Sequence, residues 1–272
     1  MEPVVRRLLT FDCEGAQLGA TIDAAAGETG ILIVTGGSQT RIGSHRLFER
    51  LAARLAAAGH PCFRFDRRGV GDSGGDDPGY RESGPDLASA VTSFRAEAPD
   101  LKRIIGLGLC DGATALALHG GAAGADALIL VNPWLVEAEA DAPPPAAIRQ
   151  HYRQRLSSLQ GWKRLLTGSV SYRKLFKGIL KASNPLEGSA LAVDVAQALR
   201  RTHLPTALIL AKGDATAIAA AAEIRTPPFR RLIGQTREVD TDSHTFAKPG
   251  DLDALVQALL DVMPDLVRRE GA

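Results

Sequence analysis

The chain has 272 residues, of which 45% are hydrophobic and 23% charged, and its formal net charge is +1 at pH 7. This length suits one large α/β domain or two small ones, and the composition is that of an ordinary globular protein. The balanced charge gives no general attraction to nucleic acid. No apolar run reaches the 18 residues that a membrane span requires, so we expect neither nucleic acid nor a membrane as a partner.

The three cysteines, Cys13, Cys62 and Cys110, cannot all pair with one another. They form no C-x-x-C motif and no Cys/His cluster, so the sequence predicts no metal and no other cofactor. The amino terminus has no long apolar segment after its charged residues, which argues against a signal peptide. These features together predict a protein of the reducing cytoplasm.

Strand and helix patterns alternate in the first half of the chain. Residues 4–11 and 17–23 are typical of a hairpin, and the continuous apolar run 31–35 predicts a central strand buried on both faces. Further along we expect a helix at 44–58, a strand at 62–65, a helix at 85–98, a strand at 103–107, a helix that ends near residue 120 and a strand at 127–131.

This pattern is interrupted after residue 133. Residues 134–188 begin with a Pro/Ala-rich acidic segment and then look helical with no strand, which predicts a helical cap inserted into the core. Between Arg149 and Lys181 there are nine Lys or Arg and no Asp or Glu. This basic stretch either receives an anionic substrate such as a CoA thioester, touches an acidic surface, or is a solvated helix face.

The alternation resumes after the insertion. We expect a helix at 189–201, a strand at 206–211, a helix at 216–224, a last strand region within 231–239 and a closing helix at 249–262. The predicted core is therefore an α/β domain made of residues 1–133 and 189–272, with a mostly parallel sheet covered on both faces. Right-handed crossovers place the carboxyl ends of its strands along one edge, where ligands bind in open sheets.

The segment Gly108-Leu109-Cys110-Asp111-Gly112 lies between the strand at 103–107 and the helix that follows. A small-x-nucleophile-x-small turn in this context is typical of a nucleophile elbow, whose central residue has a strained backbone. The helix start favours a thiolate at Cys110 and leaves the backbone N–H of Asp111 free to hold an oxyanion. The alternative is that Cys110 is a small buried hydrophobe, as most free cysteines are.

Three polar residues follow separate predicted strands in the order Cys110, Asp214, His244. This order of nucleophile, acid and histidine is the one expected for an α/β hydrolase. An imidazole can take the thiol proton, and a carboxylate on its other nitrogen fixes the tautomer.

Each of these assignments has a structural alternative. Asp214 can instead be a helix N-cap, and His244 an ordinary loop histidine. Asp66 and Asp72 are rival acids, but they lie upstream of the elbow and suit turns. The competing histidines are His45, His60, His119, His151 and His203.

These motifs resemble the α/β-hydrolase superfamily over nearly the full length. Asp66 to Ser73 is similar to its D-x-R-G-x-G-x-S loop, and Thr35-Gly36-Gly37 stands in the place of its His-Gly-x oxyanion motif. More narrowly, the chain resembles the exosortase A system-associated hydrolase 1 family, whose members are encoded beside exosortase and exopolysaccharide genes. The segments that carry this resemblance are Gly36 to Gln39, Arg41 to Arg46, the elbow, Asn132-Pro133-Trp134 and Asp242 to Phe246.

The resemblance implies an eight-stranded α/β-hydrolase sheet and an oxyanion hole made by the backbone N–H groups of Gly37 and Asp111. Ser38 takes the place of Gly37 if the loop is offset by one residue. Two positions depart from the superfamily pattern. The usual nucleophilic serine is Cys110, as in dienelactone hydrolases, and the usual oxyanion-motif histidine is Thr35.

We therefore predict a cysteine-dependent hydrolase of carboxylic ester or thioester bonds. Cys110 attacks the carbonyl, His244 is the base, Asp214 orients His244, and an acyl-enzyme forms. The expected substrate is a small acyl compound, with an anionic or CoA-linked donor favoured by the basic stretch. Two alternatives stay open: acyl transfer to a sugar or alcohol, and a non-catalytic scaffold that binds a partner. The sequence leaves the acyl chain, the leaving group and the oligomeric state open.

Overall fold

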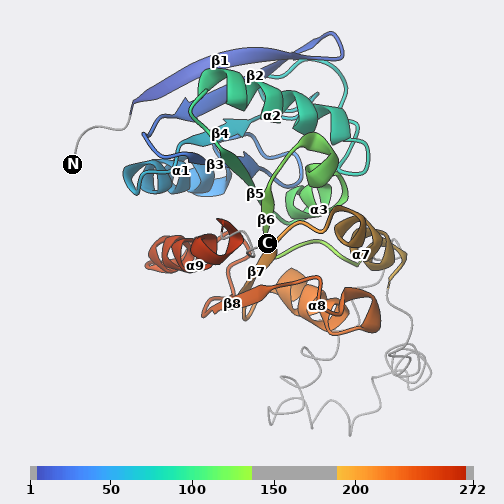
Figure 1. Cartoon of the computed structure of the whole chain (residues 1–272). Helices are drawn as coiled ribbons and strands as arrows, with labels where there is room; N and C mark the ends of the chain where they lie inside the picture. The colour runs from blue at the N-terminus through green and yellow to red at the C-terminus, as the bar shows by residue number, and fades with distance from the viewer. Residues whose placement is uncertain (1–4, 137–188, 268–272) are drawn as a thin grey trace, which may run out of the picture.

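The computed structural model describes residues 5–136 and 189–267. One sheet runs through both segments in the order β1-β2-β4-β3-β5-β6-β7-β8 (Figure 1). Its strands are β1 (Arg6–Cys13), β2 (Ala16–Asp23), β3 (Thr29–Val34), β4 (Cys62–Phe65), β5 (Arg103–Leu109), β6 (Ala127–Val131), β7 (Thr206–Ala211) and β8 (Gln235–Val239). β2 is antiparallel to both β1 and β4, and all other pairs are parallel. The predicted mostly parallel eight-stranded sheet is confirmed.

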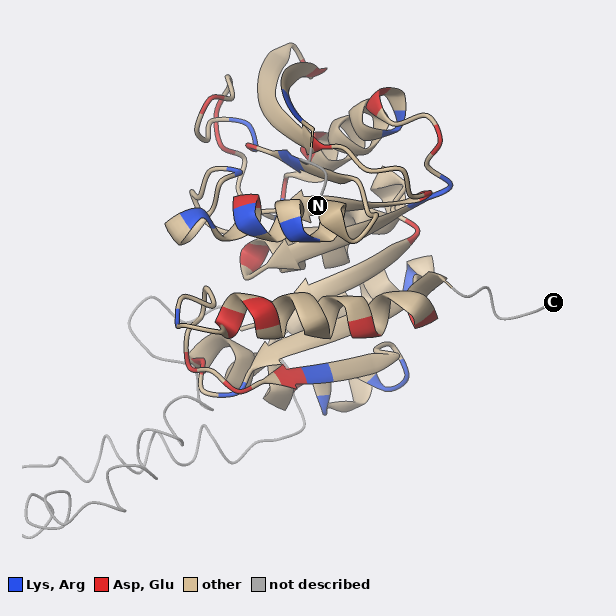
Figure 2. Ribbon diagram, turned by 90° about the vertical axis from the view of Figure 1, so that its left-hand side faces the viewer, with Lys and Arg blue, Asp and Glu red and all other residues tan. Residues whose placement is uncertain are grey.

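Helices cover both faces of this sheet. On one face lie α1 (Leu47–Ala57) and α9 (Asp251–Val267), and on the other lie α2 (Gly84–Glu97), α3 (Asp111–Ala123), α7 (Ala190–Thr202) and α8 (Ala215–Ile224). Figure 2 views the first face and shows α1 and α9 side by side, where Arg54 Nη1 and Asp253 Oδ1 are 2.7 Å apart. Each face has its own buried apolar cluster, which is why the central strands are apolar throughout.

Most predicted boundaries differ from the structure by a few residues, and three of these differences concern β5, α1 and α9. β5 continues to Leu109, because Gly108 and Leu109 still pair with β6. The helix expected from residue 44 begins as a short 3-10 turn with positive φ at His45 (42°) and Arg46 (63°), so α1 proper starts at Leu47. The closing helix starts later and ends later than expected. The apolar residues that this helix buries include Leu252, Leu255, Leu259 and Val262.

The predicted cap, residues 134–188, lies outside the described residues from 137 onward, and so does the whole basic stretch. The two chain segments that border it are joined, because the Ser189 hydroxyl donates to the carbonyl oxygen of Leu135. Within the described parts of the chain, no helix combines the length and the hydropathy needed to cross a membrane.

All four residues of β4 are buried, although one of them is an arginine. Arg64 is only 1% exposed, and its Nη2 lies 3.0 Å from Oδ2 of the fully buried Asp23. The other oxygen of Asp23 accepts from Arg6 Nε at 2.6 Å. A guanidinium group can be buried in the middle of this strand because a carboxylate on the neighbouring strand β2 neutralises it.

Replacing Asp23 should therefore leave a buried charge without its partner. We expect Asp23→Ala to lower the free energy of unfolding by about 3–5 kcal/mol, measured by urea denaturation. Glu28→Ala is the matched control, because Glu28 pairs with Lys102 at 2.6 Å on the exposed surface. That control should cost at most about 1 kcal/mol. Equal losses in the two variants would contradict the argument.

Candidate active site

Cys110 lies at the tight turn between β5 and α3. Its backbone has φ 59° and ψ −127°, a conformation that non-glycine residues rarely adopt. A Cβ added to Gly108 would lie 2.6 Å from backbone atoms of Ala113, and one added to Gly112 would lie 2.5 Å from the carbonyl oxygen of Thr35. Both positions therefore need glycine, because three pieces of backbone meet there. This is the geometry of the predicted elbow.

Asp214 and His244 follow the neighbouring strands β7 and β8. Backbone hydrogen bonds from Lys212 to Val239 (3.0 Å) and from Gly213 to Thr241 (2.9 Å) hold the two strand ends together. His244 Nδ1 lies 2.9 Å from Oδ2 of Asp214, and the same oxygen accepts from the backbone N–H of Ala217. Asp214 is thus the N-cap of α8 and the hydrogen-bond partner of His244 at once.

The imidazole of His244 also interacts with the side chain of Cys110. The hydrogen bond to Asp214 is the largest cause that raises the pKa of His244 from 6.5 to about 10, and the interaction with Cys110 is the second. Burial acts in the opposite direction but does not outweigh them. His244 is therefore protonated at neutral pH in this arrangement, which is the form that pairs with a thiolate.

The loop after β3 brings Gly37 beside the elbow. The loop is closed by the Thr35 hydroxyl, which donates to the carbonyl oxygen of Gln39 at 2.9 Å. The N–H of Gly37 donates to Oδ1 of Asp111 at 2.5 Å, and Arg67 Nη2 donates to the carbonyl oxygen of Gly37 at 2.7 Å. The backbone N–H of Asp111 opens α3 and has no acceptor within the helix.

The rival residues have structural contacts. Asp66 is buried, pairs with Arg41 and accepts from the backbone N–H of Asp72 at 3.1 Å, which fits the predicted role in a turn. The rings of His60 and His119 bond to backbone carbonyls, and His203 ends α7. His45 lies near the site, with Nε2 2.9 Å from the carbonyl oxygen of Thr245, and His151 is outside the described residues. Among the described residues, no group of three or more His, Cys, Asp or Glu could hold a metal ion.

Asn132 also lies at the site, although no sequence motif assigns a role to it. It is fully buried with φ 42°, directly after β6. Its Oδ1 accepts from the backbone N–H of Ala211 at 2.9 Å, and its Nδ2 donates to the carbonyl oxygen of His244 at 3.2 Å. Asn132 thus joins three strand ends and holds the His244 loop. An amide side chain directly after a buried strand is the signal that points to it.

Comparison of the sequence with known protein families identifies a family with this fold. The profile of the alpha/beta hydrolase family matches residues 31–269. This chain belongs to the α/β hydrolase family. No curated protein sequence shows significant similarity to it.

Solved structures with the same fold cover nearly the whole of this α/β hydrolase. The esterase Pf2001 of Pyrococcus furiosus has 13% identity and a TM-score of 0.66, over 96% of this chain and 91% of its own. DcsB in complex with a substrate analogue has 18% identity and a TM-score of 0.63, over 97% and 100%. The thioesterase domain of the curacin biosynthetic pathway has 16% identity and a TM-score of 0.56, over 96% and 100%. At these identities the likeness establishes the fold.

The pKa of His244 should depend on Asp214. In the native protein, NMR titration of the imidazole should give a pKa near 10, and Asp214→Asn should lower it. Because the folded-state pKa is raised, its contribution to stability is complete below pH 6.5 and is lost as the pH rises to about 10. Asp242→Asn is the control, since Asp242 pairs with Lys248 on the surface. An unchanged His244 pKa in Asp214→Asn would refute the assignment.

Asn132→Asp should lower kcat more than it raises KM, because a carboxylate keeps the size of the side chain but cannot donate to the carbonyl of His244. We expect a loss of roughly 10-fold or more in kcat from a misplaced base. Ser83→Ala is a control, since Ser83 is buried and bonds to Tyr80 away from the site. Normal KM and kcat in Asn132→Asp would show that Asn132 does not position His244.

Proposed function

We propose that this α/β hydrolase cleaves carboxylic ester or thioester bonds through a covalent intermediate on Cys110. The observation that carries this proposal is the placement of Cys110 at an elbow beside His244, whose Nδ1 is hydrogen-bonded to Asp214 and whose pKa is raised by both residues. An elbow presents its central side chain at the carboxyl edge of the sheet, and a charged imidazole beside it stabilises the thiolate nucleophile.

In the first half of the reaction, the thiolate of Cys110 attacks the carbonyl carbon and the oxygen becomes an oxyanion. The N–H of Asp111 donates to that oxyanion together with the N–H of Gly37. When the intermediate collapses, the leaving alcohol or thiol takes the proton of His244 and Cys110 is acylated. In the second half, His244 removes a proton from water, the hydroxide attacks the acyl carbon, and Cys110 leaves as the thiolate.

The cysteine nucleophile favours particular substrates. A thiolate leaves more readily than an amine, so an amide adduct tends to return to substrate. Thioesters and activated esters have leaving groups that compete well with the thiolate. The basic stretch between residues 149 and 181 supports an anionic or CoA-linked acyl donor. The narrower resemblance to exosortase-associated hydrolases supports a role near exopolysaccharide systems.

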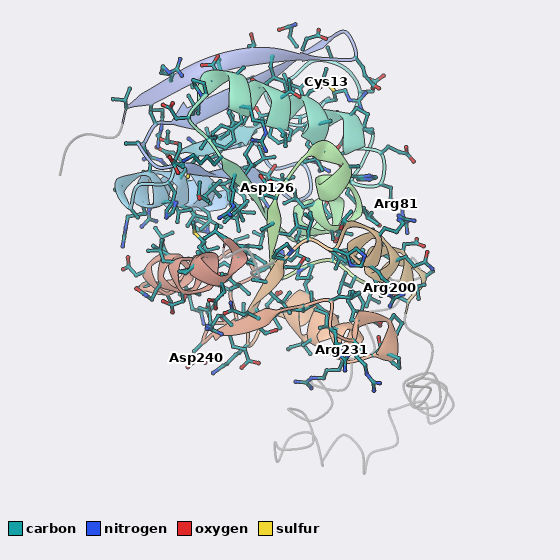
Figure 3. The ribbon with its side chains drawn as sticks, in the orientation of Figure 1. Cys13, Arg81, Asp126, Arg200, Arg231 and Asp240 are labelled. Carbon is teal, nitrogen blue, oxygen red and sulfur yellow. The ribbon has the colours of Figure 1, made fainter. Side chains whose placement is uncertain are left out.

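The deciding experiment is intact mass measurement after mixing the protein with a panel of aryl esters and acyl thioesters. We expect an acyl adduct and turnover in the native protein and no adduct in Cys110→Ala, whose kcat should fall at least about 10³-fold. Cys13→Ala is the matched control. Cys13 lies in the edge strand β1 (Figure 3), and burial raises the pKa of its thiol, so this variant should behave as the native protein does.

The absence of an adduct on every substrate, together with equal background rates in the native protein and Cys110→Ala, would contradict the proposal. Alkylation by iodoacetamide gives an independent check. A cysteine paired with imidazolium reacts well below the free thiol pKa of about 8.5, whereas burial raises the pKa of Cys62 and of Cys13. Product analysis with and without a hydroxyl acceptor separates hydrolysis from acyl transfer.

A further inference from the structure

The oxyanion site is filled by a side chain of the protein itself. Oδ1 of Asp111 lies 2.5 Å from the backbone nitrogen of Gly37. A Cβ built on Gly36 would lie 2.6 Å from this oxygen and 3.0 Å from Cβ of Cys110, so the carboxylate is beside the nucleophile. A substrate oxygen that bonds to the N–H of Gly37 must replace this carboxylate, because both need the same donor.

Arg67 lies behind this contact and has unused hydrogen-bonding capacity. Its side chain is 2% exposed, and Nη2 lies 3.7 Å from Oδ2 of Asp111. Nε and Nη1 are buried and have no hydrogen-bond partner among the residues that the structure describes. Buried polar groups are rarely left unpaired, and a guanidinium group binds a carboxylate through two parallel bonds. Arg67 is therefore prepared to take a carboxylate that it does not yet hold.

A purely structural role is the main alternative. Arg67 donates to the carbonyl oxygen of Gly37, and Asp111 accepts from its N–H. In this alternative the two hydrogen bonds only fix the conformation of the loop. Two observations argue against that reading. First, a purely structural arginine would have all of its buried N–H groups hydrogen-bonded, whereas Nε and Nη1 of Arg67 have no partner among the described residues. Second, the side chain of Asp111 is 18% exposed, so it has space to move.

We propose that the Asp111 carboxylate is an internal ligand of the oxyanion site, and that Arg67 receives it when a carbonyl oxygen binds to the N–H of Gly37. This inference rests on the proposed function and adds two residues to it. It makes the site selective, because a substrate oxygen must compete with a carboxylate. Carbonyl groups that gain the most negative charge on oxygen during attack displace the carboxylate best.

The test uses butyraldehyde, which needs no turnover. The thiolate of Cys110 adds to the carbonyl carbon and the proton held by His244 passes to the oxygen, so a hemithioacetal forms with its oxygen in the oxyanion site. Its Kd is measured from the protection of Cys110 against iodoacetamide. We expect Asp111→Ala to bind the aldehyde about 10-fold more tightly than the native protein, because a charge-assisted competitor is removed. Asp111→Asn, a milder change, should show part of this gain.

A double-mutant cycle separates displacement from a simple clamp. Arg67→Met should weaken aldehyde binding about 10-fold when Asp111 is present, and less than about 2-fold in the Asp111→Ala background. If Arg67 and Asp111 only fix the loop, Arg67→Met should weaken aldehyde binding equally with Asp111 present and in the Asp111→Ala background. The double variant Arg67→Met/Asp111→Ala carries no unpaired buried charge. It can therefore be compared with Arg67→Met even if Asp111→Ala alone folds poorly.

Asp126→Ala is the matched control. Like Asp111, Asp126 accepts from a backbone N–H, that of Ile104 at 2.8 Å, and pairs with an arginine, Arg95, at 3.1 Å. It lies at the amino end of β6, away from the elbow, and is labelled in Figure 3. Its replacement should leave the aldehyde Kd unchanged.

Unchanged or weaker aldehyde binding in both Asp111 variants would overturn the inference, and so would a failure of all variants to bind. A failure of the proposed hydrolytic activity can be told apart from a failure of this inference. If tighter binding in Asp111→Ala is found in a protein that no ester or thioester acylates, the internal ligand is real and the activity is not.

Discussion

The site depends on the close approach of backbone at the elbow. Gly36, Gly108 and Gly112 each lie where an added Cβ would be 2.5–2.6 Å from another atom, so β5, α3 and the loop after β3 touch without side chains between them. The strained φ of Cys110 costs on the order of 1–3 kcal/mol, and the surrounding contacts must hold it. One of them is the bond from the N–H of Cys110 to the carbonyl of Val131 at 3.0 Å. This contact helps to hold Cys110 beside its charged neighbours.

Charges of opposite sign alternate around the cysteine. Asp214 pairs with His244, and Asp111 lies near Arg67. In the proposed mechanism a thiolate and an oxyanion both develop in this small space. The negative charge of Asp111 would disfavour both of them if Arg67 did not balance it. The pair therefore keeps the local charge balanced while leaving one donor, the N–H of Gly37, to be shared. Electrostatic balance and access to the oxyanion site are set by the same contacts.

The sequence predicted what short-range patterns encode. The strands at 127–131 and 206–211 were placed to the residue, because each is a continuous apolar run with polar or turn-forming residues at its ends. Cys110, Asp214 and His244 were selected because each follows a predicted strand. The bond of Asp111 to Gly37, the burial of Arg67 and the bridge made by Asn132 depend on side chains that meet across distant segments, and no local pattern encodes them. Asp214 had two apparent roles because one carboxylate oxygen can accept two hydrogen bonds.

The hydrogen bond between Ser189 and Leu135 has a consequence for how this protein can vary. The chain leaves the sheet after β6 and returns before α7 at a single point, one residue from Trp134, whose N–H bonds to the carbonyl of Cys110. Closing a longer loop between ends already held together costs little extra entropy. Everything between these two residues can therefore lengthen, shorten or be exchanged while the elbow and the sheet stay the same. Relatives with different substrates can arise by changing this one segment.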